Sequence, residues 1–248
     1  FLSVVDSMTS ASRARQRTLF RSLRSLPFDV RYAWSPQSSW TVDGLQERYG
    51  TQVFVAATSR NYRIKGWDDK PVVEMVGLTF VLRGDKWLLA SDSDAHSQMP
   101  EGAFLEPWSV GAVTVARSKN VMVIGEKRWK RRLAWLARQT QTALGEVRKA
   151  WPDSGWNGRV VIYASPESDF LDEWFGRSRA AGTPKPRRDI ATFDAVVGPV
   201  WSQARVEGNT SVNASGFRMA VAPGLFKLEK DLVGQVIRHE LTHLINAR

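Results

Sequence analysis

Two histidines and a glutamate near the end of the sequence have the types and spacing needed for metal-dependent chemistry. The segment His239-Glu240-Leu241-Thr242-His243 has the pattern H-E-x-x-H. On a helix, residues four positions apart lie one turn apart on the same face, so both imidazoles can reach one metal ion. Neutral imidazole suits Zn²⁺, which lowers the pKa of bound water to about 7. We therefore predict that His239 and His243 are zinc ligands and that Glu240 is the catalytic base.

The residues around this segment predict a helix with one buried face. The alternative to a metal site is a buried helix in which hydrogen bonds satisfy both histidines. We favour the metal site because Glu240 would be costly to bury there without a partner. The apolar residues that predict the buried face are Leu232, Val233, Val236, Ile237, Leu241, Leu244 and Ile245.

A catalytic zinc ion usually has three protein ligands, and the motif supplies two. The chain begins at Phe1 and ends at Arg248, five residues after His243, so we expect a fragment of a longer protein whose third ligand lies beyond residue 248. We expect residues 1–248 alone to bind zinc weakly and to be a poor enzyme. Less favoured upstream ligands are Asp189, Asp194 and Glu207, and His96 is expected to lie in a loop.

The composition excludes several other kinds of chemistry. The chain of 248 residues contains no cysteine and three histidines, which excludes disulfide scaffolds, iron–sulfur sites and thiol nucleophiles. The 35 basic and 25 acidic residues give a net charge of +10. We expect the basic run Lys127–Arg132 to be the solvated face of a helix, with a dedicated phosphate-binding patch as the less favoured alternative. We expect the charge surplus to suit an anionic cell envelope surface. No nucleic-acid-binding signature is present, so nucleic acid is not an expected partner.

The first part of the chain, residues 1–105, predicts an α+β domain. A helix over residues 8–26 precedes four strands, and Arg83-Gly84-Asp85-Lys86 predicts the turn between the last two. Apolar residues alternate along the third strand at Val72, Val76, Leu78, Phe80 and Leu82, interrupted by Glu74. This order is typical of a helix followed by a curved antiparallel sheet. The four strands are expected at residues 28–34, 52–58, 72–82 and 87–90.

The second part, residues 106–248, predicts a domain in which helices and strands alternate. A helix over residues 127–150 is indicated by apolar residues at spacings of three and four, and it ends at Trp151-Pro152. Ser165-Pro166 predicts the start of another helix. A loop is expected at residues 182–188 and a final helix from residue 230 to the end. Strands are expected at residues 111–123, 159–164, 190–197 and 217–221.

The second part resembles the peptidase MA-like metallohydrolases, the gluzincins. The resemblance lies in the segments Phe217–Val221, Pro223–Phe226 and Val236–His243, which includes the H-E-L-T-H core. It implies a zincin-like fold, His239 and His243 as zinc ligands, Glu240 as general base, and a glutamate on a following helix as third ligand. No residue in this sequence matches that glutamate or a residue that stabilises the transition state.

The first part resembles the NTF2-like superfamily, in which a helix precedes a cone-shaped sheet that often holds a pocket. The resemblance ends in the segment Asp85–Asp92. A pocket lined by aromatic residues is one interpretation, and core or sheet-surface packing is the favoured one. The combination of both domains resembles an actinobacterial envelope lipoprotein. The aromatic residues considered are Trp34, Trp40, Tyr62, Trp67 and Trp87.

Together these observations favour an extracytoplasmic zinc metallopeptidase, lipid-anchored in its full-length form, that acts on a peptide or protein substrate. We expect an extended peptide to bind along an edge strand, formed either by residues 190–197 or by residues 217–221. The alternative is a non-enzymatic envelope binding or scaffold protein in which the zincin-like domain is vestigial.

Overall fold

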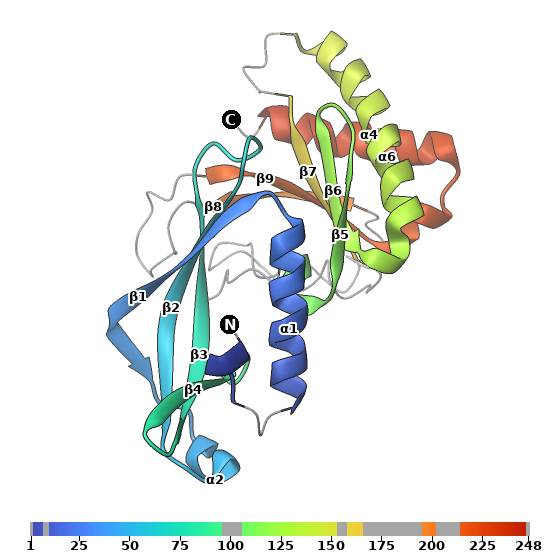
Figure 1. Ribbon diagram of the computed structural model, residues 1–248. Helices are drawn as coiled ribbons and strands as arrows, with labels where there is room; N and C mark the ends of the chain where they lie inside the picture. Colours follow the sequence, from blue (N-terminus) through green and yellow to red (C-terminus); the bar gives the residue numbers. More distant parts are fainter. Residues whose placement is uncertain are drawn as a thin grey trace.

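The computed structural model describes residues 2–6, 10–95, 106–152, 158–165, 195–201 and 214–246. These residues form two separate β-sheets with helices packed against them (Figure 1). The α+β class predicted from the sequence is confirmed at this level.

The first sheet is an antiparallel meander in the order β1-β2-β3-β4. The predicted strands are present but longer than predicted, and the first continues through Pro36. Proline has no N–H to donate to a neighbouring strand, and an edge strand tolerates this loss. The register places Val72, Val76 and Leu78 on one face of β3, as the alternation predicted. The elements are η1 (Leu2–Val4), α1 (Ser10–Ser25), β1 (Phe28–Trp40), α2 (Leu45–Tyr49), β2 (Val53–Ile64), β3 (Val72–Arg83) and β4 (Lys86–Ser91).

The second sheet has five strands in the order β5-β6-β7-β9-β8. The pairs β6/β7 and β7/β9 are parallel, whereas β5/β6 and β8/β9 are antiparallel. The prediction of one strand over residues 111–123 is wrong, because the chain turns at Ser118, whose N–H donates to the carbonyl of Val121. The strands are β5 (Val113–Arg117), β6 (Val121–Glu126), β7 (Val160–Ala164), β8 (Ala195–Trp201) and β9 (Ala214–Val221).

Helices cover both faces of the second sheet. Alternate residues of β6 and β7 point to opposite faces, so Val123 and Ile162 contact one core and Met122 and Val161 contact another. The two long helices α4 and α6 pack on the first face, and α1 packs on the second. Within the described ranges no helix is long and apolar enough to span a membrane. The elements are α3 (Pro107–Val110), η3 (Lys127–Trp129), α4 (Lys130–Ala150), η5 (Pro223–Lys227) and α6 (Lys230–Asn246).

Some predictions fall on residues that the structure does not describe. They are the helix starting at Ser165-Pro166, the loop over residues 182–188, and the first part of the strand over residues 190–197. The aromatic residues considered for a pocket lie in different environments. Tyr62 is buried, Trp40 and Trp67 are partly buried against separate cores, and Trp87 is 47% exposed. The side chain of Trp34 lies outside the described part.

A buried ion pair joins the two halves of the chain. Asp68 follows β2 in the first half, and Arg218 lies in β9 in the second half. Two guanidinium nitrogens of Arg218 donate to the two carboxylate oxygens of Asp68 at 2.6 and 2.9 Å, and its third donates to the hydroxyl of Tyr163 at 2.8 Å. Both charged side chains are almost fully buried. Burial lowers the pKa of Arg218, but the charge and hydrogen bonds of Asp68 together with Tyr163 and Glu106 outweigh this effect, so the net pKa is raised.

Glu106 lies fully buried beside this ion pair. The hydroxyl of Tyr62 donates a hydrogen bond to its Oε1, and the ring of Trp108 meets Tyr62 and Tyr163 edge-on. Burial raises the pKa of Glu106 to about 7, and the positive charge of Arg218 opposes this shift. The proton on Glu106 is therefore held more tightly in the folded protein than in the unfolded chain.

The raised pKa of Glu106 predicts a pH dependence of stability. Its pKa is about 4.5 in the unfolded chain and about 7 when folded, so the folded state binds more protons between these values. The stabilising effect is complete below pH 4.5 and is lost as the pH rises through 7, by about 3 kcal/mol in the free energy of unfolding.

Urea titrations at several pH values test this prediction with Glu106→Gln, which keeps an acceptor for Tyr62. Burial also raises the pKa of Glu240 to about 7, so Glu106→Gln should reduce the decline in stability between pH 5 and 7 without abolishing it, whereas Glu47→Gln, a change at an exposed position, should retain the full decline. An unchanged decline in Glu106→Gln would contradict the assignment to this residue.

Candidate metal centre

The predicted motif lies on α6, the last helix of the described chain. Buried residues at spacings of four, four and three hold this helix against the sheet, as the apolar pattern predicted: Val233, Ile237, Leu241 and Leu244. Leu232 differs from the prediction, because it lies at the helix start on the outer face and is 45% exposed. The helix therefore presents a fixed second face, which carries the two histidines.

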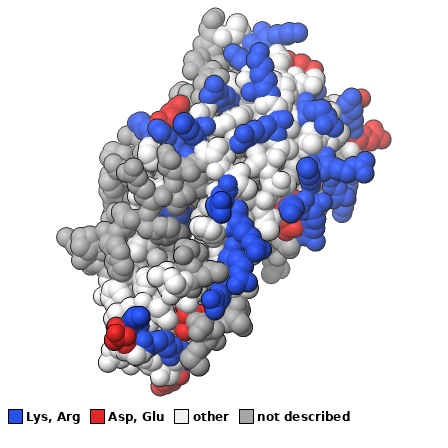
Figure 2. All heavy atoms as spheres, in the orientation of Figure 1, with Lys and Arg blue, Asp and Glu red and all other residues white. Residues whose placement is uncertain are grey.

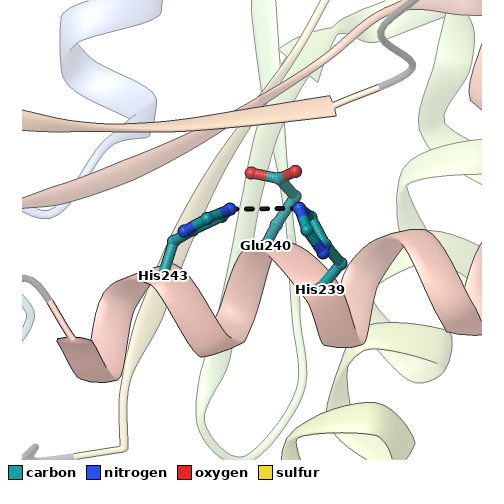
Figure 3. A group of neighbouring side chains, drawn as sticks. All are labelled: His239, Glu240 and His243. Carbon is teal, nitrogen blue, oxygen red and sulfur yellow. Dashed lines mark hydrogen bonds between the residues drawn. The ribbon is translucent and has the colours of Figure 1, made fainter.

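The two histidines point toward each other from adjacent turns of α6 (Figure 3). Their Nε2 atoms are 3.0 Å apart, and their rings meet edge-on with centroids 4.7 Å apart. Both side chains are exposed. The two imidazoles are hydrogen-bonded to each other, as the alternative to a metal site expects, but they are exposed and not buried as that alternative expects.

Glu240 lies next to the histidines at the border of the buried face. Its carboxyl group is buried and lies close to His239 (Figure 3). Burial raises the pKa of Glu240 to about 7, and a hydrogen bond from the backbone N–H of Val197 opposes this shift. A carboxylate with a pKa near neutrality is well suited to accept and release protons.

The contact between Glu240 and Val197 brings β8 to the motif. Val197 lies in β8, which pairs with β9 along one side and is the last strand of the sheet among the described residues. Sequence reasoning missed this contact, because a backbone N–H has no side-chain signature. A second contact fixes the helix from the other side, since Arg238 donates to Glu146 of α4 at 2.7 Å.

The three side chains form a group that could hold a metal ion. The ligand atoms of His239, Glu240 and His243 lie within 4.8 Å of one another, and in the described part of the chain no other group of three His, Cys, Asp or Glu residues comes as close. The less favoured ligands Asp189, Asp194 and Glu207 lie outside the described residues, as does His96.

Comparisons with known proteins add no family to this geometry. No protein-family model, no curated protein and no solved structure matches the chain. The resemblances described for the two parts of the sequence therefore stay predictions, and the function must be argued from the residues.

Proposed function

We propose that this protein is a zinc-dependent metallopeptidase, with His239 and His243 as zinc ligands and Glu240 as the general base. The observation that carries this proposal is the placement of two exposed imidazoles beside one buried carboxyl group. Nitrogen ligands of a tetrahedral zinc ion lie about 3.3 Å apart when each bond is 2.0–2.1 Å. The 3.0 Å separation of the two Nε2 atoms is close to this value.

A bound zinc ion supplies a Lewis acid that acidifies water and polarises a carbonyl group. The carboxylate of Glu240 takes a proton from the attacking water as its oxygen bonds to the scissile carbonyl carbon. The same carboxyl group then gives this proton to the leaving amine as the C–N bond breaks. The N–H of Val197 holds the carboxyl group in place during both transfers.

The substrate is an extended peptide bound along β8. The sequence predicts peptide binding along one of two segments, residues 190–197 or residues 217–221. The strand order favours the first, which contains the start of β8, because β9 lies between β7 and β8. An edge strand offers its N–H and C=O groups to a peptide in the β conformation. The proposal includes a zincin-like fold for the second sheet with α4 and α6, an NTF2-like fold for the first, and an extracytoplasmic, lipid-anchored location.

Metal content and affinity test the zinc site. The natural gene product should contain about one zinc ion per chain. His239→Ala and His243→Ala should each weaken zinc binding more than about 100-fold in isothermal titration. Loss of a residue that only hydrogen-bonds to a ligand lowers metal affinity by about 10–100-fold, and loss of the ligand itself should lower it further. Both variants should stay folded because the two side chains are exposed.

The matched control is His96→Ala, which removes the third histidine of the chain and should leave the affinity unchanged. A purified protein that contains no zinc and binds none tightly would contradict the proposal. That result would favour the alternative, an envelope binding or scaffold protein with a vestigial site.

A further inference from the structure

The outer face of α1 is a row of arginines. Arg17, Arg21 and Arg24 follow one another at spacings of four and three, so they lie on one face, opposite the core residues Leu19 and Leu26. All three side chains are exposed. The helix contains no aspartate or glutamate. Like charges at these spacings repel each other and destabilise an isolated helix.

The described part of the protein does not neutralise this row. Among the described residues no carboxylate forms an ion pair with Arg17, Arg21 or Arg24. The nearby carboxylate of Asp92 pairs with Arg15, on a different face of the helix. The charge of the row is therefore available to an external partner.

The basic surface continues beyond α1. Strand β5 ends the described sheet on one side and contacts both α1 and α4, which cover opposite faces of that sheet, so all three elements border its β5 edge. Figure 2 shows basic side chains gathered over α1 and around α4, with few acidic ones between them. Glu126, which lies between these elements, pairs with Arg128. Further exposed basic residues of β5, the following turn and the start of α4 are Arg117, Lys119, Lys127, Lys130 and Arg131.

An aromatic side chain stands among the arginines of α1. Phe20 is 39% exposed, and the guanidinium group of Arg24 lies 5.9 Å from the centre of its ring. Guanidinium groups bind phosphate oxygens in a forked geometry, and aromatic rings enter the boundary between headgroups and acyl chains. A nucleic acid duplex also offers phosphates, but it has no apolar layer beneath them.

We propose that the face formed by α1, β5 and the start of α4 docks on a bilayer that contains anionic phospholipids. The row Arg17, Arg21 and Arg24 binds headgroup phosphates, and Phe20 enters the interface. This proposal does not rest on the proposed zinc site, because it uses no residue of α6.

Vesicle co-sedimentation tests this proposal. The protein should bind vesicles of phosphatidylglycerol and phosphatidylcholine at low salt, and it should not bind phosphatidylcholine alone. The triple variant Arg17→Glu, Arg21→Glu, Arg24→Glu should reduce vesicle binding by at least about 100-fold. Each basic residue near an anionic surface contributes to the free energy of binding, and all three contributions are lost. The triple glutamine variant should also bind more weakly and serves if the glutamate variant does not fold.

The matched control reverses three exposed charges elsewhere, Arg63→Glu, Lys70→Glu and Lys86→Glu. Arg63 lies on the sheet face away from α1, because its neighbours Tyr62 and Ile64 contact the α1 core. The control should bind nearly as well as the original protein. An equal loss in the control would overturn the proposal, since net charge alone would explain the binding.

Phe20→Ala distinguishes an anionic bilayer from a nucleic acid duplex as the phosphate-containing partner. It should weaken vesicle binding and leave any binding to a DNA duplex unchanged. Duplex binding that is tighter than vesicle binding, together with no effect of Phe20→Ala on vesicles, would overturn the proposal in favour of a nucleic acid partner.

Discussion

Replacing Glu240 by glutamine should leave zinc bound and reduce peptide hydrolysis by about 10²–10⁴-fold, the usual contribution of a general base. The amide cannot take the proton from water, whereas its oxygen can still accept the hydrogen bond from Val197. The fold should therefore be unaffected, and the loss should appear in kcat. The substrate for this measurement is a fluorescein-labelled unstructured protein, cleaved by the natural gene product loaded with zinc.

The control for this change is Glu229→Gln, an exposed position directly before α6. It should retain both zinc binding and hydrolysis. Hydrolysis that continues at the original rate in Glu240→Gln would contradict the role of general base. Loss of zinc from Glu240→Gln would instead assign Glu240 to the metal ligands. Its zinc affinity would then fall as it does in His239→Ala and His243→Ala.

Asp68→Ala should be strongly destabilising. It leaves the guanidinium group of Arg218 buried without its counter-charge, which costs about 3–5 kcal/mol in the free energy of unfolding. For a chain of this size the loss corresponds to a decrease in Tm of about 10 °C. Thermal unfolding followed by circular dichroism measures it.

Two further variants define the cause of this loss. Glu126→Ala breaks the exposed pair with Arg128 and should cost about 1 kcal/mol or less. The double variant Asp68→Leu, Arg218→Met removes both buried charges and should recover much of the stability lost in the single variant. Equal stabilities of Asp68→Ala and Glu126→Ala would show that the buried pair is not a major stabilising contact.

The sequence was sufficient to predict the local elements and the motif. The period of Leu133, Leu136 and Leu144 predicted α4, and the spacing of Val233, Ile237 and Leu241 predicted α6 and its buried face. Such periodic patterns reflect which face of a helix is buried, whatever segment packs against it, so they can be recognised in the sequence alone. The strand ends were less predictable, because pairing with neighbours extended β1 and β2 beyond their apolar runs.

Long-range contacts could not be predicted from the same patterns. Asp68 and Arg218 are 150 positions apart, and each has the sequence surroundings of an ordinary surface charge. The contact of Glu240 with the backbone of Val197 likewise depends on the strand order of the second sheet. A single sequence contains neither signal, since topology determines which segments meet.

The core shared by the two sheets has a consequence for dissecting the protein. Tyr62 and Ile64 of the first half contact Met122 and Tyr163 of the second in one cluster, and Asp68 neutralises Arg218 within it. A cut between the halves would expose this apolar surface on both pieces. It would also separate Arg218 from the carboxylate of Asp68. We therefore expect that residues 106–248 do not fold stably by themselves, and that a minimal form that carries the histidines must retain the first sheet.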